Sequence, residues 1–122
     1  MTIFSQLIPI PIPEPIQNKS SVSTLKQCLD WGKPALTIID VRSRVLFNSI
    51  HITGSIPMPM DEPADLTLSN LELNRDIYVY AETDEQTTLA ANKLRQAGYQ
   101  KVSELLGGLT AWKKAKYPID CG

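Results

Sequence analysis

The chain has 122 residues, 43% of them hydrophobic, which is enough for one buried core and too few for two independent domains. Its 12 lysines and arginines balance 13 acids, so a formal charge of −1 excludes a general attraction to nucleic acid or to anionic membranes. No apolar run reaches the roughly 20 residues of a membrane-spanning helix and no secretory leader is recognisable, so a soluble, cytoplasmic protein is expected.

Residues 1–19 are predicted to form an extended, proline-rich arm. Proline occupies every second position from 9 to 15, and each proline ring fixes φ and removes an N–H donor, which forbids a helix. In a β-extended arm the four prolines lie along one edge, and Ile10 and Ile12 keep their donors on the other. The arm could add a strand to a partner's sheet or fold back on its own domain. The side chains available for either are Ile8, Ile10, Ile12 and Ile16.

Residues 20–122 are predicted to form one α/β domain. A first helix begins after Ser21 and ends at Gly32, with Leu25, Cys28 and Leu29 on one buried face. Strands and helices then alternate, which favours a mostly parallel central sheet with helices on both faces. The expected elements are strands 35–41, 77–81 and 101–105, a helix after the second strand that ends at Gly98, and a helix that starts at Gly107-Gly108 and ends before Pro118.

Three separated motifs resemble those of the rhodanese-like, or sulfurtransferase homology, family. IIDVR (38–42) with HITGSIPMP (51–59) is similar to the family's DVR…GHIPGA…P pattern. IYVYA (77–81) leading into LAANKLRQAGY (89–99) is similar to its central strand, active loop and helix, and LLGGLTAW (105–112) to its closing GGxxAW element. The resemblance implies a single rhodanese-like domain with its site in the loop after the central strand, and the carboxyl ends of parallel strands predict the same place.

Several motif residues are expected to be structural. Asp40 can brace the loop that follows its strand, and Arg42 can pair with a carboxylate or with carbonyl groups. Leu46 stands where the family often has an acid near this arginine, and Ile50 replaces the glycine that usually precedes the histidine. The partner of Arg42 therefore stays open. His51, the single histidine, is expected to be packed and hydrogen-bonded, because no cysteine or serine partner is identifiable for it. Gly54, and one or both of Gly107 and Gly108, are expected to supply a positive φ angle or a close backbone approach. Trp112 is expected to pack against the sheet.

The resemblance places alanine where the family carries its sulfur-bearing cysteine. In active members, backbone N–H groups and the helix dipole stabilise a thiolate or persulfide, and arginines hold the anionic donor. Glu82 and Gln86 occupy the arginine positions, and Asp84 stands where glycine is common. Alanine can neither attack nor carry sulfur, so a catalytically inactive domain is predicted. The degenerate loop comprises Ala81, Glu82, Thr83, Asp84, Glu85 and Gln86.

The acids of this loop have two interpretations. They can satisfy the N–H groups and dipole of the following helix, or they can form a surface for a basic partner. The expected role is therefore a protein-binding or regulatory module that uses the acidic loop or the arm, without cofactor, metal, nucleic acid or membrane.

Two alternatives remain open. One is a sulfurtransferase that uses a relocated cysteine, for which Cys121 is the candidate because Cys28 is expected in the core. The other is a divalent-cation site built from Glu82, Asp84 and Glu85, which is a weak signal without a defined binding loop.

Overall fold

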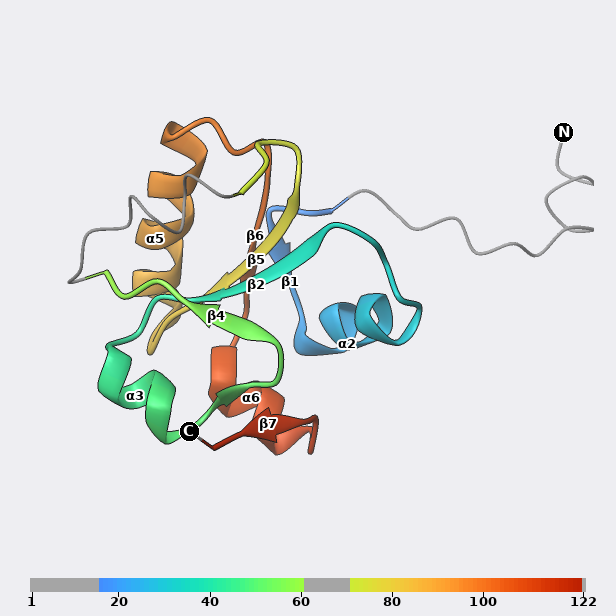
Figure 1. Cartoon of the computed structure of the whole chain (residues 1–122), viewed down its shortest axis with the longest axis vertical. Coiled ribbons are helices and arrows are strands. Elements are labelled where there is room, and N and C mark those ends of the chain that lie inside the picture. Colours follow the sequence, from blue (N-terminus) through green and yellow to red (C-terminus); the bar gives the residue numbers. More distant parts are fainter. Residues whose placement is uncertain (1–15, 61–70, 122) are drawn as a thin grey trace, which may run out of the picture.

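The structure is a computed structural model in which residues 16–60 and 71–121 are described (Figure 1). The central sheet has five strands in the order β1-β6-β5-β2-β4, and each neighbouring pair is parallel. The predicted α/β fold with a mostly parallel sheet is thus confirmed. The strands are β1 (Lys19–Ser20), β2 (Leu36–Asp40), β4 (Ser55–Pro57), β5 (Asp76–Tyr80) and β6 (Lys101–Leu105).

Helices cover both faces of this sheet. Residues of α5 pack in a cluster on one face, and residues of α2 and α6 pack in a second cluster on the other, as the separate positions of these helices in Figure 1 show. The helices are α2 (Val22–Asp30), α3 (Arg44–Ser49), α5 (Asp84–Gln96) and α6 (Gly108–Lys114).

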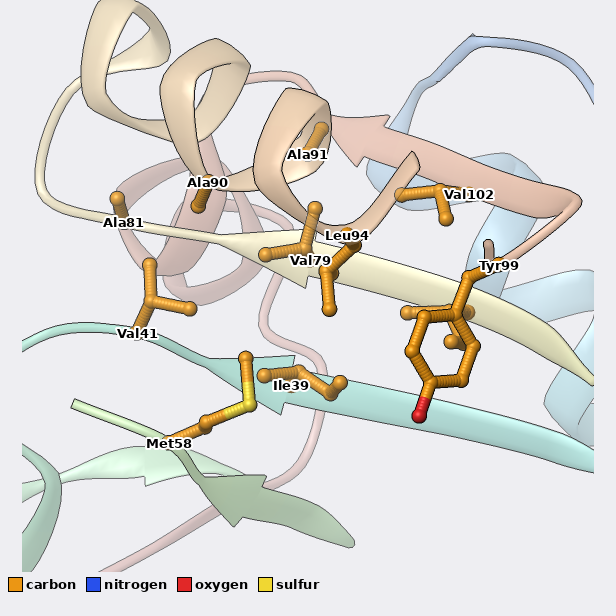
Figure 2. Close-up of a cluster of buried hydrophobic side chains, with 11 residues drawn as sticks. Ile39, Val41, Met58, Val79, Ala81, Ala90, Ala91, Leu94, Tyr99 and Val102 are labelled. Carbon is orange, nitrogen blue, oxygen red and sulfur yellow. The ribbon is translucent and has the colours of Figure 1, made fainter. Parts of the chain in front are cut away.

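The middle strand β5 determines which side chains meet each layer. All five of its residues are buried, as expected for a continuous apolar run in a parallel sheet. Because side chains alternate along a strand, Ile77 and Val79 join the α5 cluster, while Tyr78 and Tyr80 join the α2 and α6 cluster. Figure 2 shows the α5 cluster, with Ala81 at one end of it on the same side as Ala90.

The two helices with clear start signals begin where the sequence predicts. Ser21 caps α2 by accepting a hydrogen bond from the N–H of Thr24, and α6 begins at Gly108 after the left-handed Gly107. The helix α3 was not predicted, since six residues are too short to show a helical period. Its start nevertheless has a signal, because Ser43 accepts a hydrogen bond from the N–H of Leu46.

The predicted buried face of α2 is partly wrong. Leu25 is fully buried, but Leu29 is 37% exposed and Cys28 is only half-buried. The apolar spacing predicted the helix correctly. However, only the side of α2 that carries Val22 and Leu25 packs in the cluster against the sheet.

A small antiparallel ladder joins the carboxyl end of the described chain to the segment after α3. β3 (His51–Ile52) pairs with β7 (Ile119–Asp120), and the indole N–H of Trp112 donates to the Pro118 carbonyl at 2.7 Å. Trp112 is 1% exposed and belongs to the α2 and α6 cluster, so its predicted packing against the sheet is confirmed.

The amino-terminal arm is only partly within the described residues. Residues 1–15 lie outside them, whereas Ile16 packs against the α2 and α6 cluster and Lys19–Ser20 forms the edge strand β1. None of the helices formed by the described residues is long and apolar enough to span a membrane.

Candidate functional site at the carboxyl edge of the sheet

The segment of residues 81–86 joins the carboxyl end of β5 to α5, whose first turn contains Asp84, Glu85 and Gln86. Ala81, the first residue after β5, is 6% exposed and its methyl group packs in the α5 cluster. Two residues later Thr83 caps α5, and its side-chain oxygen accepts a hydrogen bond from the N–H of Gln86 at 3.2 Å. The turn is therefore tight, and position 81 points its side chain toward the core below α5.

Backbone donors of this loop are bound by the chain's own side chains. The N–H of Ala81 donates to the hydroxyl of Thr87 at 2.9 Å, and that hydroxyl donates to the Thr83 carbonyl at 3.0 Å. Thr87 is 2% exposed and was missed by the sequence analysis. A buried threonine four residues after the capping threonine was the available signal, because its hydroxyl can bond back to the preceding turn.

A second contact joins the loop to the start of α6. The N–H of Gly107 donates to the carboxylate of Asp84 at 3.0 Å. Asp84 thus binds another element instead of capping its own helix, a role that Thr83 fills. Gly54, Gly107 and Gly108 have φ of 87°, 77° and 50°, which confirms the positive φ angles predicted for them.

Three acids and two leucines form an exposed surface at this edge, here called the carboxyl-edge patch. Glu82, Asp84 and Glu85 are exposed, and they carry the negative charge of the loop. Leu89 follows Glu85 by one helical turn and is 59% exposed, and Leu106, 40% exposed, precedes the glycine that Asp84 binds. Charge and apolar area therefore adjoin each other on this surface.

A buried polar network supports the loop from below. Asp40, fully buried, accepts hydrogen bonds from the backbone and guanidinium N–H groups of Arg42 and from the Tyr80 hydroxyl, the last at 2.6 Å. The guanidinium also donates to the Ile50 carbonyl at 2.6 Å, which answers the open question of the partners of Arg42. Tyr80, the residue directly before Ala81, was missed because a tyrosine in an apolar strand carries no separate signal of a polar role.

Burial and bonding shift two pKa values in this network. Burial alone would lower the pKa of Arg42, but its hydrogen bonds to Asp40 and the charge of that carboxylate raise it above the ordinary value. Burial, followed by the bond to Asp40, raises the pKa of Tyr80 well above its ordinary 10.0. Both groups therefore keep their protons through the neutral range.

His51 lies in a packed position. Its ring stacks on Phe47 with centroids 3.8 Å apart, and its Nδ1 lies 2.7 Å from the Phe47 carbonyl oxygen. These contacts match the packed, hydrogen-bonded histidine that was predicted.

The two cysteines are both away from position 81. Cys28 lies on α2, and its sulfur is 3.7 Å from the hydroxyl of Tyr78, whose side chain is on the sheet face opposite to Ala81. Cys121 follows β7 and is exposed. In residues 16–60 and 71–121, no group of three His, Cys, Asp or Glu side chains could hold a metal ion, so the acids of the loop gain no geometric support as a cation site.

Fold and site together define a parallel α/β domain whose candidate site is the loop between its middle strand and a helix at the carboxyl edge. A model of the rhodanese-like domain matches residues 21–115, and the chain belongs to this family.

Solved structures and curated relatives agree with this assignment. The chain is 50% identical to the Alr3790 protein from Anabaena sp., whose crystal structure matches 84% of this chain and 80% of that one with a TM-score of 0.79. The solution structure of the rhodanese-like domain of Alr3790 is 48% identical, with a TM-score of 0.81 over 88% and 81% of the two chains.

Among curated proteins, the chain is 30% identical over 104 residues to "Probable adenylyltransferase/sulfurtransferase MoeZ" from Mycobacterium tuberculosis, covering 82% of this chain and 26% of that protein. It is 27% identical over 82 residues to a "Sulfurtransferase" from Allochromatium vinosum, covering 67% and 76%. The chain spans only between 20% and 49% of the length of three of its curated relatives. The protein is thus a rhodanese-like domain related to sulfurtransferase proteins.

Proposed function

We propose that this rhodanese-like domain does not carry sulfur and acts instead as a protein-binding or regulatory module. The observation that carries the proposal is the buried methyl group of Ala81 at the place where the family resemblance implies the sulfur-bearing cysteine. A thiolate or persulfide needs a sulfur atom at this position, and the methyl group supplies no nucleophile.

The surroundings of Ala81 support the same conclusion. The N–H groups of Ala81, Gln86 and Gly107 already donate to Thr87, Thr83 and Asp84, so they are occupied by the chain's own side chains. The exposed carboxylates would also repel an anionic donor such as thiosulfate, each by about 1 kcal/mol at 4 Å in water.

The positions of the two cysteines argue against a relocated nucleophile. Cys28 belongs to the layer on the opposite face of the sheet, and Cys121 is exposed after β7. Both are free thiols, which fits the cytoplasmic location that we include in the proposal, because thiols stay reduced there.

The sulfur half of the proposal is tested by transfer from thiosulfate and from 3-mercaptopyruvate to cyanide. We expect no transfer by the natural protein or by the Cys28→Ser and Cys121→Ser variants. Ala81→Cys combined with Glu82→Arg and Gln86→Arg should exceed Ala81→Cys alone by on the order of tenfold or more, since the anion site regains positive charge. Transfer by the natural protein that either serine variant abolishes would overturn the proposal.

The binding half rests on the carboxyl-edge patch. Exposed leucines beside three carboxylates form a surface suited to a partner with basic and apolar side chains, since such patches mark interaction sites.

A matched pair of charge reversals tests this surface. The full chain serves as bait, and captured proteins are quantified for the natural sequence, for Glu82→Lys with Glu85→Lys, and for Glu72→Lys, an exposed acid outside the loop. We expect a partner that the double variant loses, that the Glu72→Lys control keeps, and whose binding weakens as salt rises. Equal capture by all three proteins would show that the patch is not the binding surface.

A further inference from the structure

A groove of about 770 Å³ lies between α2 and the edge strand β1, away from the loop that holds Ala81. Its volume is in the range of pockets that hold a ligand of drug size or a short peptide. Its lining comes from the start of the described chain, from one side of α2 with the turn after it, and from β5. The lining includes Ile16, Lys19, Cys28, Trp31, Lys33 and Tyr78.

The walls of the groove are mixed apolar and polar. Trp31 is 59% exposed at one side, and Ile16 is partly buried against the α2 and α6 cluster. Cys28 places its sulfur 3.7 Å from the Tyr78 hydroxyl inside the groove. An exposed aromatic side chain such as Trp31 suits proline-rich segments, which are already extended and lose little entropy on binding.

The chain itself supplies such a segment at this place. Ile16 is both the first described residue and a lining residue of the groove, so residues 1–15 connect to the chain directly beside it. An extended chain advances about 3.3 Å per residue, which puts position 12 within roughly 13 Å of Ile16. A segment tethered so closely has an effective concentration on the order of millimolar, above that of most free competitors.

The alternation of side chains along β1 is consistent with the preceding residues lying beside the groove. The carbonyls of Asn18 and Ser20 accept hydrogen bonds from the N–H groups of Glu104 in β6 and of Leu106 directly after it. Even-numbered residues therefore turn their backbone groups toward the sheet. Ser20 and Ile16 also direct their side chains to the α2 face, where Ser20 bonds to Ser103 at 2.6 Å. If the alternation continues upstream, the isoleucines at positions 10 and 12 share this face with the groove, and the four prolines turn their donor-free side to the open edge.

We propose that residues 9–15 of the arm dock in this groove, with the isoleucine at position 12 on its apolar wall. Glu14 is the single charged side chain among positions 1–15, and the charged lining residues of the groove are Lys19 and Lys33. Lys33 already pairs with Asp76 at 2.6 Å, so Lys19 supplies the charge that is complementary to Glu14. The docked arm covers Cys28. A partner that uses this groove must displace the arm, whereas the carboxyl-edge patch stays accessible.

Disulfide trapping on the full chain tests the docking. With Cys121→Ser in place, Cys28 is the one remaining native thiol, and a second thiol is introduced by Ile12→Cys or, as control, by Thr2→Cys. Under mild copper-phenanthroline oxidation we expect Ile12→Cys to form an intramolecular disulfide with Cys28 at least tenfold faster than Thr2→Cys. Equal rates, or a covalent dimer whose yield rises with protein concentration, would overturn the proposal, the dimer by assigning the groove to a second copy.

Tryptophan fluorescence gives a second measurement without engineered thiols. Trp112 is 1% exposed, so acrylamide quenching reports on Trp31. We expect Ile12→Asp to raise the quenching constant at least twofold over the natural chain, and Thr2→Asp to leave it unchanged. An unchanged constant in Ile12→Asp would contradict the docking. Both tests are independent of sulfur transfer and of the carboxyl-edge patch.

Discussion

At the residue scale, the Asp40, Arg42 and Tyr80 network explains how a charged pair is held beneath the loop. A buried carboxylate is costly unless its oxygens are paired and hydrogen-bonded, and here Asp40 has donors from both neighbours. The Tyr80 hydroxyl also accepts from the N–H of Ile52 at 3.2 Å, which links β5 to β3. The strand that positions Ala81 is therefore fixed by polar contacts as well as by packing.

Tyr80→Phe should change both the stability and its dependence on pH. At pH 7 we expect a loss of about 1–3 kcal/mol, because Asp40 and the N–H of Ile52 each lose a buried partner. The folded pKa of Tyr80 is raised, so its contribution is complete below about pH 10 and declines as pH rises further, because the unfolded chain releases this proton first. Urea unfolding from pH 7 to 11.5 should show a slope reduced by up to about 1.4 kcal/mol per pH unit in the variant.

A matched control isolates the buried bond. Tyr117→Phe removes a hydroxyl whose partner is the exposed Ser23 at 3.4 Å, and it should cost much less at pH 7. Identical alkaline slopes for the natural protein and Tyr80→Phe would contradict the assignment.

At the element scale, the junction of β6 and α6 is built around Gly107. With φ of 77°, Gly107 precedes α6 in the left-handed region, and a Cβ added there would lie 2.5 Å from the Cβ of Ala111. Its N–H also holds the carboxylate of Asp84, so the geometry of this glycine connects α6 to the start of α5.

Gly107→Ala should therefore cost more than a substitution that only strains the backbone. Gly54 has φ of 87° and nothing within 4 Å of an added Cβ, so Gly54→Ala is the control for strain alone. We expect about 1–2 kcal/mol for Gly54→Ala and about 2–5 kcal/mol for Gly107→Ala, measured by urea unfolding. Equal losses would show that the Ala111 contact relaxes without cost.

At the scale of the whole molecule, two cores share one sheet. The α5 cluster and the α2 and α6 cluster are separated only by the five strands, and β5 contributes alternate side chains to both. Because neither layer has a sheet of its own, we expect the domain to unfold in one cooperative step.

A substitution in either layer should therefore lower the stability of the whole domain and leave a single unfolding transition. Leu25 and Leu94 are 0% and 2% exposed on opposite faces, and each leucine-to-alanine change should cost about 2–5 kcal/mol. Leu89→Ala, on the exposed side of α5, should stay within about 0.5 kcal/mol. Far-ultraviolet circular dichroism and tryptophan fluorescence should give coincident curves for all variants, and separate transitions would refute a shared core.

The alternation of apolar runs and helical periods in the sequence was sufficient to predict the parallel sheet, the positions of β2, β5 and β6 along the chain and the start of α2. These features follow from local patterns, because backbone geometry repeats within a few residues. The alanine at position 81, where the family resemblance implies a cysteine, was also visible in the sequence, since a motif fixes the place of one residue.

Only the tertiary structure decided how distant groups satisfy one another. The bonds from Tyr80 to Asp40, from Gly107 to Asp84 and from Ala81 to Thr87 depend on which strand ends lie side by side. The half-buried position of Cys28 likewise depends on how far the neighbouring layer extends over α2. Sequence determined which elements form because their signals are local, and packing decided the site because hydrogen bonds and burial are set by contacts between residues far apart in the chain.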